Sequence, residues 1–88
     1  MNEPESFPPP TFTTLVQMLA TQAMVALGHL EDPLEKKPVK RLPLAKHMID
    51  MLEMLQEKSK NNLNADESYS LSQVLSQLRM AFVQAQKD

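Results

Sequence analysis

Proline and glycine are confined to the first half of this chain, and their placement constrains the fold more than any other feature. All seven prolines and the single glycine lie within residues 1–43, and none occurs from Leu44 to Asp88. Turns between strands depend heavily on these residue types. The second half is therefore predicted to be mostly helix, and the whole chain to be all-α.

Three segments carry apolar residues at helical spacing, at about residues 12–27, 44–60 and 65–86. Gly28 follows the first segment, where a left-handed C-cap favours glycine. Asn64 and Glu67 have the spacing of a capping box at the start of the third. Because the second and third helices are separated by only a few residues, they are predicted to form an antiparallel αα-hairpin.

The length of 88 residues predicts one domain. Residues 1–10 hold four prolines and are predicted to be a disordered Pro-rich tail. Residues 11–86 are predicted to be a single helical domain with a Pro-containing connector at 29–43. In the second helix, the predicted buried stripe comprises Leu44, Met48, Met51, Leu52 and Leu55, widened by Ala45 and Ile49.

The helices carry more apolar surface than one short chain is expected to bury. The candidate interface residues, which lie off the main stripes or at their edges, are Met18, Val25, Met54, Tyr69, Met80 and Val83. A second copy would cover them, and symmetric dimers are the commonest assembly. We therefore predict a homo-oligomer, with a dimer favoured, that acts as an interaction or scaffold module; an unidentified protein partner and a marginally stable monomer are the alternatives.

The net charge is −2, but residues 36–60 hold seven basic residues and three acidic ones. Four of the bases form a candidate basic patch: Lys36, Lys37, Lys40 and Arg41. Such a patch can contact nucleic-acid phosphates, so a nucleic-acid-associated protein is the alternative function. The acidic overall balance and the lack of aromatic residues between Phe12 and Tyr69 disfavour it.

The composition excludes several kinds of chemistry. There is no cysteine, which excludes disulfides, thiolate metal sites and cysteine nucleophiles. A single glycine excludes the common phosphate-binding loops. His47 and Asp50 are spaced to share a helix face, but Leu44 stands where a di-iron bundle needs glutamate. We therefore predict no enzymatic activity, no catalytic residues, no cofactor and no metal site.

The sequence also bears on location. The first residues are acidic, whereas a secretory signal begins with basic residues. The apolar stretch from Phe12 to Leu27 is interrupted by polar residues and is shorter than the ~20 residues of a spanning helix. We predict a cytoplasmic protein without a membrane span.

Residues 42–67, LPLAKHMIDMLEMLQEKSKNNLNADE, with LRMAFV at 78–83 and FTTLVQMLATQAMVALG at 12–28, resemble a bacterial family of unknown function, domain of unknown function 1844. The most specific part is the run from Glu57 to Leu63. Ser59 stands where the family usually has threonine, and Asn61 where it has glycine. The resemblance implies a short, cytoplasmic, helical protein and brings no activity, substrate or cofactor.

Overall fold

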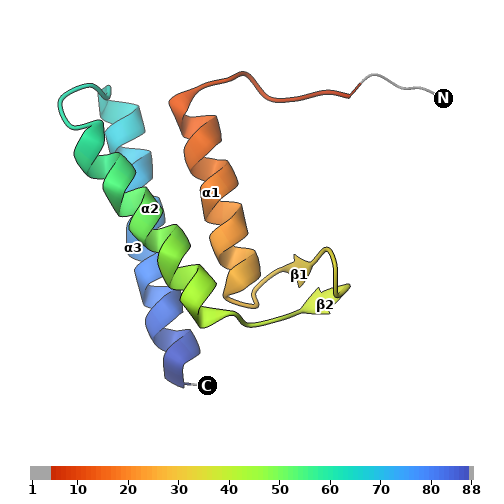
Figure 1. Cartoon of the computed structure of the whole chain (residues 1–88). Coiled ribbons are helices and arrows are strands. Elements are labelled where there is room, and N and C mark those ends of the chain that lie inside the picture. Colours follow the sequence, from red (N-terminus) through yellow and green to blue (C-terminus); the bar gives the residue numbers. More distant parts are fainter. Residues whose placement is uncertain (1–4, 88) are drawn as a thin grey trace.

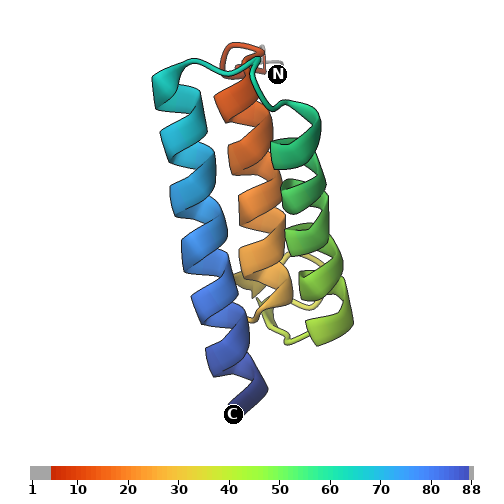
Figure 2. The ribbon, with the colours of Figure 1, turned by 90° about the vertical axis from the view of Figure 1, so that its left-hand side faces the viewer.

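The computed structural model describes residues 5–87, in which three helices are joined by a short hairpin and a tight turn. The elements are α1 (Phe12–Ala26), β1 (Glu31–Asp32), β2 (Lys37–Pro38), α2 (Leu42–Lys58) and α3 (Ala65–Lys87). Each helix packs against the other two, and α2 runs antiparallel to both α1 and α3 (Figures 1 and 2). The predicted helical fold and its αα-hairpin are confirmed, whereas the small antiparallel β-hairpin was not predicted.

The chain before α1 is extended and leads away from the bundle (Figure 1). Its junction with α1 is held by Thr14, whose N–H donates to Thr11 Oγ1 at 3.1 Å and whose hydroxyl donates to the Pro9 carbonyl at 2.7 Å. Residues 5–10 have no regular secondary structure. Residues 1–4, the rest of the predicted disordered tail, lie outside the described residues, and the disorder stays a prediction.

The residues at the predicted helix ends do mark where the helices begin or end. Gly28 has φ 85° just after α1, and Asn61 has φ 72° just after α2. At the start of α3 the capping box is reciprocal: Glu67 N–H donates to Asn64 Oδ1 at 2.8 Å, and Asn64 N–H donates to Glu67 Oε1 at 3.0 Å. These local signals fix where the chain reverses.

The boundaries of α2 differ most from the prediction, since it spans 42–58 instead of 44–60. Pro43 lies in the first turn, where its missing N–H would have had no partner within the helix. At the other end, Ser59 donates its hydroxyl to the Leu55 carbonyl at 2.6 Å, and the helix stops. The ends of α1 and α3 each differ from the prediction by a single residue.

Three alanines allow α1 and α2 to approach closely. Ala23, Ala26 and Ala45 are at most 1% exposed. The Arg41 N–H donates to the Ala26 carbonyl at 2.7 Å, so α2 begins beside the end of α1. Small side chains at such a contact bring two helix axes near the lower end of the usual 8–10 Å spacing.

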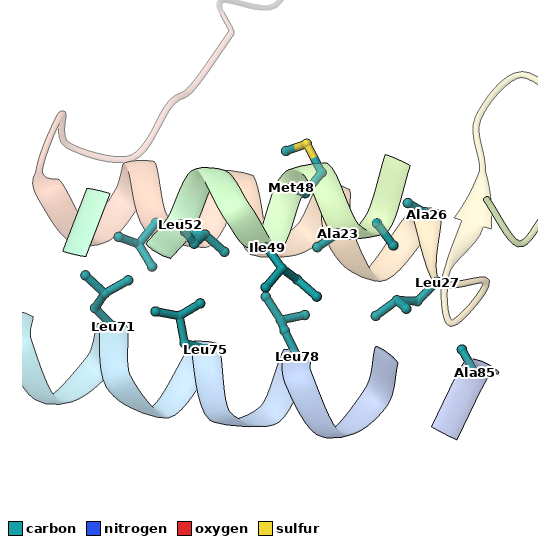
Figure 3. Close-up of a cluster of buried hydrophobic side chains, with 12 residues drawn as sticks. Ala23, Ala26, Leu27, Met48, Ile49, Leu52, Leu71, Leu75, Leu78 and Ala85 are labelled. Carbon is teal, nitrogen blue, oxygen red and sulfur yellow. The ribbon is translucent and has the colours of Figure 1, made fainter. Parts of the chain in front are cut away.

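The buried face of α2 is shifted toward one edge of the predicted stripe. Leu44 and Met51, which were predicted to be core, are 46% and 37% exposed. Ala45 and Ile49, which were predicted to widen the stripe, are buried as expected, and α2 faces both α1 and α3. Figure 3 shows Ile49 directed toward Leu78 of α3. The buried core comprises Val16, Ala23, Ala26, Leu27, Ala45, Met48, Ile49, Leu52, Leu71, Leu75, Leu78 and Ala85.

We expect Leu52→Ala to destabilise the fold by about 2–5 kcal/mol, because Leu52 is 0% exposed and its removal leaves a cavity between the helices. Chemical denaturation followed by circular dichroism measures the change. Met54→Ala, two residues on and 43% exposed, is the matched control and should cost less than about 1 kcal/mol. Equal losses in both variants would contradict the placement of α2.

Candidate interaction surface

Five of the six predicted interface residues are exposed. The exposed fractions are 56% for Met18, 43% for Met54, 67% for Tyr69, 72% for Met80 and 50% for Val83. Val25 is half-buried near the C-terminal end of α1, and a place at an interface stays a prediction for all six residues. The exposed residues do not form one surface. Three lie on α3, and the other two belong to α1 and α2.

The α3 outer face is the side of this helix turned away from the core residues Leu71, Leu75 and Leu78. It consists of Tyr69, Ser72, Gln73, Ser76, Met80 and Val83, all of them exposed. Spacings of three, four and seven residues place them on one stripe about three helical turns long. Met80, Val83 and the stem of Arg79 line a shallow apolar hollow on it.

The charge on this helix is unusually low. Between Glu67 and Lys87, α3 carries one ionisable side chain with a formal charge, that of Arg79. Arg79 donates to Glu53 of α2 through Nε at 3.0 Å and through Nη2 at 2.8 Å. The carboxylate compensates the only cation along this stretch. The α3 outer face is therefore electrically neutral over most of its length.

Helix α1 is also uncharged, since Phe12–Ala26 contains no charged residue, whereas Val83 on the α3 outer face shares a hollow with Lys46, Asp50 and Glu53 of α2. The exposed positions of α1 include Gln17, Thr21 and Gln22. By contrast, the exposed side chains of α2 include Lys46, Asp50, Glu57 and Lys58. The bundle is thus divided into a charged side, α2, and an uncharged side, α1 with α3.

A second apolar surface, the α1–α2 flank, was only partly predicted. It consists of Leu15, Met18, Leu44, Met51 and Met54, each between 37% and 56% exposed. The other side of α2 is committed to α3, because Gln56 Nε2 donates to Ser72 at 3.4 Å and Glu53 binds Arg79. The exposure of Leu44 and Met51 was not predicted. Residue spacing shows which side chains share a helix face, but it does not show which edge of that face a third helix covers.

Two of the four predicted basic-patch residues have partners within the chain. Arg41 forms an ion pair with the buried carboxylate of Asp32. Lys40 donates from Nζ to the Ala85 carbonyl at 2.9 Å, near the end of α3. Lys36 and Lys37 are exposed on the β-hairpin, whose sequence also carries Glu31 and Glu35. The structure therefore does not bring the four cations together as one open patch.

Asp32 organises the β-hairpin from within. Its Oδ1 accepts from the N–H groups of Leu34 at 2.8 Å and Glu35 at 3.0 Å, which closes the turn between β1 and β2. The Glu35 N–H, followed by the Arg41 side chain, lowers the pKa of Asp32 below its ordinary 3.8 against the opposing effect of burial. The carboxylate form is thus the one that the fold stabilises.

Other chemistry finds little support in the described part of the chain. Within residues 5–87, no group of three His, Cys, Asp or Glu side chains is placed to hold a metal ion. Asp50, paired with His47 in the sequence prediction, instead accepts from Lys46 Nζ at 3.0 Å. Among the same residues, no helix has the length and apolar character needed to cross a bilayer.

The family model for the domain of unknown function DUF1844 matches residues 9–84. The chain belongs to the DUF1844 family. The match covers all of α1, the β-hairpin, α2 and most of α3, so the resemblance drawn from residues 12–83 is confirmed. No match was found among curated proteins or among solved structures. DUF1844 membership identifies a small helical protein and names no activity.

We expect Asp32→Asn to lower the melting temperature of this DUF1844 protein at pH 7, because the amide loses the ion pair with Arg41. A lowered folded-state pKa contributes stability above the ordinary carboxyl value of 3.8, and this contribution is lost as pH falls through the folded-state pKa. The difference from wild type should therefore shrink below about pH 4. Thermal melts from pH 7 to pH 2.5 measure it.

The exposed neighbour offers the control for this experiment. Glu31→Gln removes a carboxylate from the same strand and should follow the wild-type pH profile closely. A constant difference between wild type and Asp32→Asn at all pH values would contradict the linkage.

Proposed function

We propose that this protein is a non-enzymatic helical module that associates with a second copy of itself through the α3 outer face and the adjoining uncharged side of α1. It serves as an interaction or scaffold unit. The observation that carries this proposal is the separation of charge, since residues 68–86 hold one charged side chain, Arg79, already compensated by Glu53.

Charge depletion is what distinguishes the core of a protein interface from ordinary surface, together with enrichment in tyrosine and methionine. Both properties occur here, with Tyr69 and Met80 at 67% and 72% exposed. A solvent-facing helix of this length ordinarily carries charges on its polar side. The serine and glutamine side chains of α3 provide hydrogen bonds without the desolvation cost of buried ions.

The size of the surface fits a dimer. The 23 residues of α3 and the 15 residues of α1 span about 35 Å and about 22 Å at 1.5 Å per residue. With each helix about 10 Å wide, the two offer a projected face of roughly 600 Å². Two such faces total about 1,200 Å², which is the lower bound of the range for specific protein interfaces.

One feature weighs against a catalytic role. The α3 outer face holds no His, Asp, Glu, Lys or Cys, so no general base on it could activate the hydroxyls of Ser72, Ser76 or Tyr69. The pairing of Arg41 with Asp32, and of Lys40 with Ala85, also leaves the nucleic-acid alternative without a specific supporting observation.

We expect the wild-type chain to have about twice the monomer mass of 10.0 kDa in light scattering after gel filtration at high micromolar concentration. Met80→Glu should weaken the association at least about tenfold, because it buries an unpaired carboxylate at the interface. Met54→Glu, on the α1–α2 flank, is the matched control and should keep the dimer mass. A wild-type protein that stays monomeric at these concentrations would refute the proposal.

A further inference from the structure

We infer that two copies pair with their α3 helices antiparallel, on a two-fold axis that passes beside Ser76. This inference rests on the proposed function and specifies the geometry of the same surface. It follows from the spacing of the exposed residues along the α3 outer face, where Tyr69 and Val83, and Ser72 and Met80, lie at equal distances on either side of Ser76.

Ser76 is the central member of the stripe and, with Ser72, one of its two smallest. Tyr69 lies seven residues before it and Val83 seven residues after it, so all three share one line along the helix. In an antiparallel pair centred on Ser76, residues at equal distances on either side face each other. Tyr69 of one copy then packs on Val83 of the other, and the two serines let the helices approach closely.

The next layer combines unequal sizes in the same way. Ser72 lies four residues before Ser76 and Met80 four after it, so each long methionine faces a small serine. Large residues against small ones interdigitate, whereas a parallel pair would set Met80 against Met80 and Tyr69 against Tyr69.

Charge at the two ends of α3 favours the same orientation. The first turn carries Asp66 and Glu67, and the last turn carries Lys87. An antiparallel pair places the acidic first turn of each copy beside the basic last turn of the other. A parallel pair would instead bring like charges together at both ends, which opposes association.

Single cysteines test this geometry cleanly, because the chain has no cysteine of its own. Ser76→Cys, Tyr69→Cys, Val83→Cys and Met54→Cys are prepared in the full chain, and each is treated with a short bismaleimide crosslinker. A residue beside a two-fold axis lies close to the same residue of the partner. Ser76→Cys should therefore yield severalfold more covalent dimer than the other three cysteine variants. An equimolar mixture of Tyr69→Cys and Val83→Cys should also crosslink efficiently.

The outcomes separate the inference from the proposed function. Efficient crosslinking of Tyr69→Cys or Val83→Cys with itself would indicate a parallel pair and overturn the inference. A dimer by light scattering in which Ser76→Cys does not crosslink would overturn the position of the axis while leaving self-association in place. A monomer by light scattering would refute both.

Discussion

The close contact between α1 and α2 determines most of the remaining structure. Ala23, Ala26 and Ala45 are small, fully buried members of the core that the two helices share, and the hydrogen bond from the Arg41 N–H to the Ala26 carbonyl places the start of α2 beside the end of α1. With that pair set, α2 has a single orientation in which Met48, Ile49 and Leu52 are covered. The groove left between α1 and α2 then receives the leucines of α3 (Figure 3).

Local signals made the helices predictable, and tertiary contacts explain where prediction failed. Gly28, Asn61 and the Asn64–Glu67 pair act within a few residues of their own positions, so the sequence alone locates them. The buried face of α2 depends on two partners distant in sequence, and spacing could not show that Leu44 and Met51 would be left at its edge. The β-hairpin depends on the Asp32 carboxylate, which accepts hydrogen bonds from the N–H groups of its own turn. The three prolines of the connector indicated an irregular segment, so the sequence did not predict this hairpin.

The interaction surface was predictable in part for the same reason. Tyr69, Met80 and Val83 lie opposite the core of α3, and periodicity alone separates opposite sides of a helix. Val25 is half-buried, which spacing alone did not show. Within the predicted basic cluster, Arg41 contacts Asp32 and Lys40 contacts the Ala85 carbonyl, and neither contact has a sequence signature.

The hydrogen bond from Lys40 to the Ala85 carbonyl joins positions 45 residues apart. A cation at the end of a helix also interacts favourably with the carbonyl groups of its last turn. The order of the connector and the order of the last turn of α3 are consequently linked. If either segment frays, the other loses this hydrogen bond, so local opening of the connector weakens the last turn of α3 as well.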